Sequence, residues 1–101
     1  MKVTKRVQER LEELLEQLGF RVRYEKGNFK GGYCVLEKQN LVMVNKFYTL
    51  EGRVNVLIDV INNINLNWEA LTEEQKKLVK EIRKINDLKA QLNLQQEPPQ
   101  T

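Results

Sequence analysis

Basic and aromatic side chains are interleaved along residues 20–53 in a way that suits binding of a polyanion. This stretch has seven Lys and Arg against three Glu, a net charge of +4, whereas the whole chain carries only +3. Basic side chains contact phosphates and aromatic rings stack on bases, which is how a sheet binds single-stranded nucleic acid. The candidate binding residues are Arg21, Arg23, Lys26, Phe29, Lys30 and Tyr33.

Two other interpretations of this stretch stay open. The first is that Tyr24 and Phe47 belong to the core and the lysines are solvated strand residues, because a charge of +4 is modest for a nucleic-acid binder. The second concerns the glycine-rich loop 26–32, whose backbone N–H groups and two lysines can cradle a phosphate. That loop lacks the Gly-Lys-Ser/Thr ending of a phosphate loop, and turn conformations explain its glycines equally well.

The composition argues against an enzyme. The chain has no histidine, so a Ser-His or Cys-His nucleophile pair cannot form within it. A zinc site needs several thiolates or imidazoles, and Cys34 is the single cysteine. We therefore expect no catalytic residues, no metal site and no cofactor. Because free cysteine is among the most buried residue types, Cys34 is expected in the core.

The length of 101 residues fits one small domain, which we expect over residues 1–94 with a disordered tail over 95–101. No apolar run approaches the ~20 residues that cross a bilayer, so no membrane association is expected. A lone cysteine cannot form an internal disulfide, which favours a cytoplasmic location.

Three segments show helical periodicity with recognisable ends. Thr4 can cap a helix over residues 5–18 that Gly19 stops, and Thr49 can cap a second helix over 50–65. Thr72 and Gln75 form a capping box for a third helix that runs to about residue 92. In that helix a heptad-like apolar seam can pack on the core or dimerise the protein; it consists of Leu71, Leu78, Ile82, Ile85 and Leu92.

Between the first two helices the apolar period changes to two, which predicts strands over 20–25, 33–38 and 41–46. The run Leu41-Val42-Met43-Val44 is apolar on both faces and is expected to be the best-covered strand. The predicted fold is α+β in the order α-β-β-β-α-α, with a three-stranded antiparallel sheet covered by helices.

The first function hypothesis is a non-enzymatic interaction protein that self-associates or binds a protein partner. Nucleic-acid binding through residues 20–53 is the alternative.

The central part of the chain contains the blocks Leu18-Gly19-Phe20, Tyr24-Glu25-Lys26-Gly27-Asn28-Phe29-Lys30-Gly31-Gly32-Tyr33-Cys34 and Val44-Asn45-Lys46. They resemble a family of small bacterial proteins of unknown function. The resemblance covers roughly half of the chain and implies no activity.

A second resemblance rests on Val42-Met43-Val44-Asn45 and on a helix that begins near Arg53. This order is similar to the ImmA/IrrE-type metallopeptidase domain, in which such a strand precedes a helix with His-Glu-x-x-His. Here Ile58 and Asn62 occupy the two histidine positions and Asp59 the glutamate position. The resemblance therefore implies a catalytically inactive, zinc-free relative.

Overall fold

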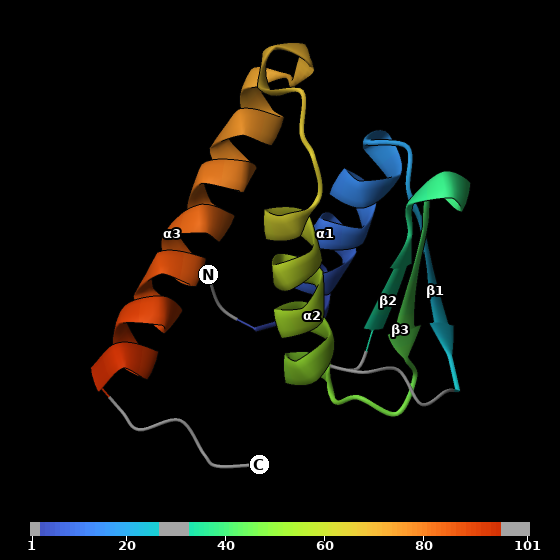
Figure 1. Cartoon of the computed structure of the whole chain (residues 1–101), viewed down its shortest axis with the longest axis horizontal. Coiled ribbons are helices and arrows are strands. Elements are labelled where there is room, and N and C mark those ends of the chain that lie inside the picture. Colours follow the sequence, from blue (N-terminus) through green and yellow to red (C-terminus); the bar gives the residue numbers. More distant parts are fainter. Residues whose placement is uncertain (1–2, 27–32, 96–101) are drawn as a thin grey trace.

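Within the part of the chain that is described, three α-helices lie on one side of a three-stranded sheet (Figure 1). The computed structural model describes residues 3–26 and 33–95, with side chains up to residue 85. The predicted α+β class and the order of elements are confirmed. In chain order the elements are α1 (Lys5–Gln17), β1 (Arg21–Glu25), β2 (Tyr33–Leu36), the 3-10 helix η2 (Glu37–Gln39), β3 (Leu41–Asn45), α2 (Leu50–Asn63), the 3-10 helix η3 (Trp68–Ala70) and α3 (Glu73–Gln95).

The sheet is mixed, so the prediction of a purely antiparallel sheet was wrong. Its strand order is β1-β3-β2; β2 runs antiparallel to β3, whereas β1 runs parallel to it, with Arg21 opposite Leu41 and Glu25 opposite Asn45. Strand β3 takes the centre because it is apolar on both faces, as the sequence indicated. The charged strand β1 and the shorter strand β2 then lie at the two edges, so β1 pairs with β3 instead of with its sequence neighbour β2.

The predicted helix starts and the stop of α1 at Gly19 are confirmed, whereas α2 ends earlier than predicted, at Asn63, and α3 continues further, to Gln95. Thr4 accepts a hydrogen bond from the Val7 amide (3.1 Å), and Thr49 accepts one from the Gly52 amide (3.1 Å). Gly19 follows α1 with φ +94°, a left-handed conformation that a residue with a Cβ rarely adopts, and the chain turns there into β1.

The core lies between the sheet and the helices, with α2 packed against both α1 and α3 (Figure 1). Leu78 and Ile82 of α3 are buried in it, so the described part of the predicted seam packs within the protein instead of on a second copy. The Leu92 side chain and residues 96–101 of the predicted tail lie outside what the structure describes. The largest fully buried apolar side chains are Leu11, Leu14, Leu15, Leu57, Ile61 and Ile82.

The face of the sheet that points away from the helices carries Arg21 and Arg23 on β1, Met43 on β3 and Cys34 on β2. Cys34 is half-buried, so the expectation that it is a core residue was wrong. The physical reason is its position, because it pairs with Met43 on the face that no described helix covers.

Candidate functional site

The basic candidates of strand β1 lie on the outer face of the sheet. Arg21 and Arg23 are two residues apart on one strand, so both side chains point to the same side, and both are exposed. The Arg23 guanidinium pairs with the Glu25 carboxylate at 2.8 Å. Lys26 follows the end of the strand and is exposed, whereas Phe29 and Lys30 lie outside the described residues.

Tyr33 points the other way. It packs against the core on the helix-covered side, and its hydroxyl donates to Asp59 Oδ2 of α2 at 2.6 Å. Its strand β2 is also at the opposite edge of the sheet from β1. The structure therefore brings Arg21 and Arg23 together but does not bring Tyr33 to them.

The Tyr33–Asp59 contact predicts a pH dependence of stability. The hydrogen bond to Asp59, with partial burial, raises the pKa of Tyr33 from 10.0 to about 12. The folded-state pKa is above the unfolded one, so the stabilisation is complete below pH 10 and is lost as the pH rises through about 12. Denaturant unfolding across this range should show falling stability, with a shallower fall in Tyr33→Phe. An unchanged slope in Tyr33→Phe would contradict the assignment.

Among the described residues, the largest number of cations around one aromatic ring is found elsewhere, between η3 and α3. Three basic groups surround the Trp68 ring: the Arg83 Cζ lies 5.5 Å from its centroid, the Lys80 Nζ 5.8 Å and the Lys76 Nζ 5.9 Å. Trp68 is half-buried, with the ring packed against the edge of the core. These four residues, called the Trp68 cluster below, combine a π-face with three positive charges.

Local structure assembles the Trp68 cluster. Lys76, Lys80 and Arg83 follow one another at i, i+4 and i+7 and so share one face of α3, next to the face that buries Leu78 and Ile82. The 3-10 helix η3 precedes α3 and lays Trp68 beside that basic face.

The charges of the Trp68 cluster are poorly compensated. Cation–π contact with each side chain is worth only ~0.5–1 kcal/mol at exposed sites. Among the side chains described, the one carboxylate in ion-pair contact with the cluster is that of Glu73, which lies 3.7 Å from the Lys76 Nζ and is 93% exposed, so it is a weak partner. Three like charges within about 6 Å of one ring repel one another, so a bound anion would be favoured there.

Sequence reasoning missed the Trp68 cluster because it looked for charge excess over long segments, and residues 54–101 carry six positive and seven negative residues. The useful signal was the spacing of Lys76, Lys80 and Arg83 on one helical face that begins eight residues after the only tryptophan. In a count over the whole segment, the acidic residues of α3 cancel these charges.

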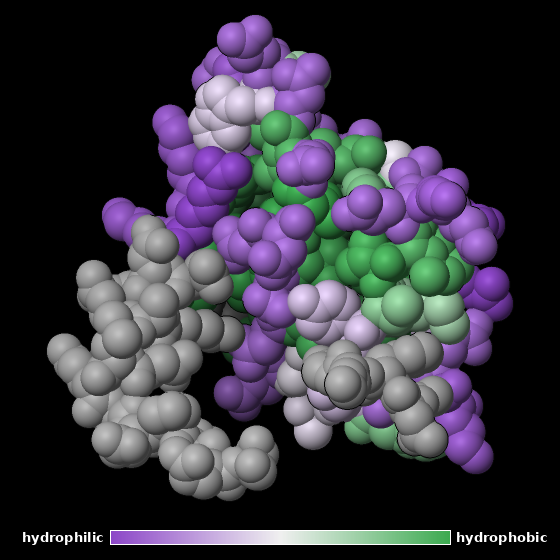
Figure 2. All heavy atoms as spheres, in the orientation of Figure 1, coloured by the Kyte–Doolittle hydropathy of each residue, from purple (hydrophilic) through white to green (hydrophobic). Residues whose placement is uncertain are grey.

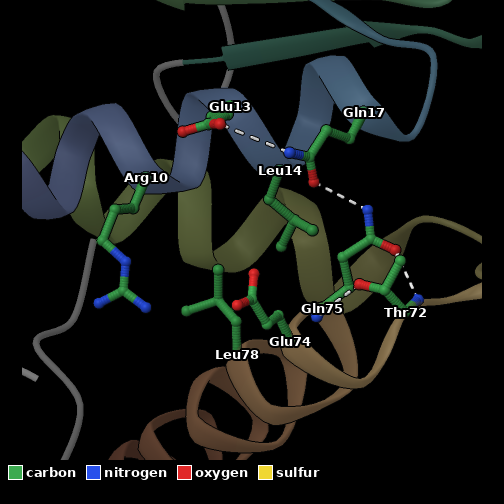
Figure 3. Close-up of a pocket in the computed structure, with 8 residues that line it drawn as sticks. All are labelled: Arg10, Glu13, Leu14, Gln17, Thr72, Glu74, Gln75 and Leu78. Atoms are coloured by element: carbon green, nitrogen blue, oxygen red, sulfur yellow. Dashed lines mark hydrogen bonds between the residues drawn. The ribbon is translucent and has the colours of Figure 1, made fainter.

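A groove between α1 and the start of α3 forms a cavity of about 340 Å³ (Figure 3). Leu14 and Leu78 supply its apolar surface, with Arg10 at one end and Thr72 at the other. The polar groups are largely bonded to one another, since Gln17 Nε2 donates to Glu13 (3.5 Å) and Gln75 Nε2 donates to Gln17 Oε1 (2.8 Å). The groove therefore works as a contact between two helices.

Gln75 has two structural roles here, which predicts a measurable stability loss on its removal. The side-chain Oε1 of Gln75 accepts a hydrogen bond from the Thr72 backbone amide (2.9 Å). The backbone amide of Gln75 donates to the Thr72 hydroxyl (3.1 Å), which confirms the capping box. Gln75→Ala loses the bond from the Thr72 amide to Oε1 and the bridge to Gln17 but keeps the bond from the backbone amide of residue 75, so we expect a loss of about 1 kcal/mol in the free energy of unfolding in urea. Lys77→Ala, an exposed neighbour, should change stability little; an equal loss there would contradict the argument.

A polar network is buried between α1 and β1. Gln8, only 2% exposed, donates from Nε2 to Glu12 Oε2 (2.9 Å) and to the Tyr24 hydroxyl (3.1 Å), and the Tyr24 hydroxyl donates to Glu12. Burial, followed by the hydrogen bond to Glu12, raises the pKa of Tyr24. Since the pKa values of both Tyr24 and Tyr33 move further from neutrality, neither hydroxyl is suited to act as a base at neutral pH.

The residues at the three positions of the metallopeptidase resemblance make contacts within the fold. Ile58 is 4% exposed, Asn62 Nδ2 donates to the Ile58 carbonyl (3.0 Å), and Asp59 accepts from Tyr33. No group of three or more His, Cys, Asp or Glu side chains is placed to hold a metal ion in the described ranges. No described helix is both long and apolar enough to cross a membrane.

The geometry thus concentrates three basic groups and one aromatic ring in the Trp68 cluster, between η3 and α3, and places a separate pair of arginines on the outer face of the sheet. The groove between α1 and α3 and the network around Tyr24 are accounted for by contacts within the fold. Comparison of the chain with protein-family models, with curated proteins and with solved structures returned no significant match.

Proposed function

We propose that this protein binds single-stranded nucleic acid, without catalysing a reaction on it, through the Trp68 cluster. The observation that supports this is the convergence of Lys76, Lys80 and Arg83 on one half-buried indole ring. Cationic groups that follow a phosphate backbone, next to an aromatic ring on which a base stacks, are the common elements of single-strand binding. In the free protein the three side chains rest against the ring, and in the complex they turn to the phosphates.

Single strands suit this surface better than duplexes. The bases of a duplex are stacked inside the helix, so an aromatic ring on a convex helix surface cannot reach their faces. An unpaired base exposes its face to Trp68 while its flanking phosphates contact Lys76, Lys80 and Arg83.

The salt dependence of binding gives the sharpest expectation. Each phosphate contact on a single strand contributes about −0.7 to the slope of log K against log salt, so three contacts give about −2. Affinity should therefore fall roughly 20-fold between about 50 mM and 200 mM salt.

Trp68 makes the experiment direct, because the chain has no other tryptophan. Titration of the protein with short oligothymidylate, followed by tryptophan fluorescence, should quench and shift the emission as a base stacks on the ring. The matched duplex should bind more weakly. Absence of any fluorescence change at low salt would overturn the proposal, and so would binding that is insensitive to salt. Equal quenching by an acidic peptide of the same charge would point instead to a protein partner.

A further inference from the structure

Strand β2 lies at an edge of the sheet. It pairs with β3 on one side only and, within the described residues, no strand pairs with its other side. All four of its residues, Tyr33-Cys34-Val35-Leu36, are uncharged and half-exposed. The opposite edge is different, because β1 carries Arg21, Arg23 and Glu25 in alternation. Charged side chains on an edge strand discourage pairing with another chain, and β2 has none.

Hydrophobic residues gather over the strands on the side of the molecule seen in Figure 2. The half-exposed state of four consecutive uncharged residues is what a strand shows when one neighbour is missing. An added strand would satisfy the outward backbone groups of β2 and cover these side chains together.

We infer that β2 pairs with β2 of a second copy of this chain, which joins two three-stranded sheets into one of six strands. An antiparallel arrangement about a two-fold axis uses the same strand on both copies, so the contact closes on itself as a dimer. With the axis at Cys34, Tyr33 lies opposite Val35 of the second copy. Both side chains point to the helix-covered side, and aromatic and β-branched pairs of this kind stabilise antiparallel strands.

The charge pattern favours pairing of β2 with β2 over the other two ways in which the edge strands of two copies can pair. Antiparallel pairing of β1 with its own copy, centred on Arg23, would place Arg23 opposite Arg23 while Arg21 faces Glu25, so the pair at the axis is destabilising and the edge stays charged. Pairing of β1 with β2 of another copy would leave a free β1 and a free β2 at the ends and would propagate into an open chain. Only β2 with β2 brings together two uncharged strands and closes.

Two Cys34 variants test the dimer in the full-length protein. Cys34→Lys places a charge on the outer face of β2, opposite its own copy, whereas Cys34→Ser keeps the strand uncharged. Sedimentation equilibrium over a range of protein concentrations should show a dimer for the wild type and for Cys34→Ser, and a monomer for Cys34→Lys. Circular dichroism melting of all three proteins establishes that each is folded at the temperature of the measurement.

Cysteine cross-linking identifies the strand. A short bis-maleimide should link two wild-type chains through Cys34. Arg23→Cys in the Cys34→Ser background carries one thiol on the β1 edge and should not cross-link. A wild type that is monomeric at every concentration overturns the inference. It is equally overturned by a dimer that survives Cys34→Lys, or by one that cross-links through position 23.

Discussion

Replacing Lys76, Lys80 and Arg83 together by alanine is expected to lower the affinity for oligothymidylate by roughly 500-fold at about 50 mM salt. This factor is the gain in binding constant that three phosphate contacts give at about 50 mM salt relative to 1 M salt, through release of counterions from the nucleic acid. The salt slope should fall from about −2 to near zero, because no member of the Trp68 cluster then contacts a phosphate. Fluorescence titrations at several salt concentrations measure both quantities.

A control of equal charge separates the local site from the overall charge. Alanine at Lys5, Lys77 and Lys84 also removes three positive charges, all exposed and none over the Trp68 ring. It should keep most of the affinity and of the salt slope. If the two triple variants lose affinity equally, binding depends on net charge alone and the Trp68 cluster is not the site.

Trp68 itself should separate stacking from phosphate contact. In Trp68→Leu the three cations remain, so the salt slope should persist while the affinity falls by the stacking contribution, about 1–3 kcal/mol. Fluorescence anisotropy of a labelled oligonucleotide measures this variant, which has no tryptophan. Loss of the salt slope in Trp68→Leu would mean that the ring only orders the basic side chains.

The helices could be predicted from sequence because their ends are local. Thr4, Thr49 and the Thr72–Gln75 box each bond to an amide within one turn, and Gly19 needs only its own backbone freedom. The burial of β3 followed from its own four apolar residues. Such features depend on residues that are close together in the chain, so they can be recognised from the sequence.

The pairing of the strands and the site depend on residues far apart in the chain. Whether β1 pairs with β2 or with β3 is decided by which strand takes the centre, and the hydrophobic pattern of β1 is the same in both cases. The face on which Tyr33 lies followed from its register opposite Val44, which a search for basic and aromatic residues does not consider. Charge counting over segments likewise concealed Lys76, Lys80 and Arg83.

The second large effect is expected at Arg53, which fixes the turn between β3 and α2. Its Nη2 donates to the Lys46 carbonyl (2.7 Å), its Nε donates to the Tyr48 carbonyl (3.2 Å), and its guanidinium lies 4.7 Å from the centroid of the Tyr24 ring. These contacts connect the turn, strand β1 and the first turns of α2. Arg53 also marks the helix start in the metallopeptidase resemblance, and its bonds give it a structural reason to be there.

Arg53→Met keeps the length of the side chain and removes every donor. Hydrogen bonds from a charged group contribute about 1.5–3 kcal/mol each, and the partly exposed turn lets water replace part of that, so we expect a loss of about 3 kcal/mol. For a domain whose total stability is about 5–15 kcal/mol this is a large fraction, measured as a fall in the urea midpoint with an unchanged m-value.

Two further variants decide whether that loss comes from the bonds of Arg53. Arg53→Lys keeps the charge but cannot donate to both carbonyls in the same planar geometry, so it should recover only part of the stability. Arg21→Met removes an exposed arginine of β1 and should stay within about 0.5 kcal/mol of the wild type. Full recovery in Arg53→Lys would mean that charge over the Tyr24 ring, and not the fork of donors, holds the turn. If Arg21→Met loses as much stability as Arg53→Met, neither the charge nor the donors of Arg53 hold the turn. The loss would then be a general effect of removing a positive charge.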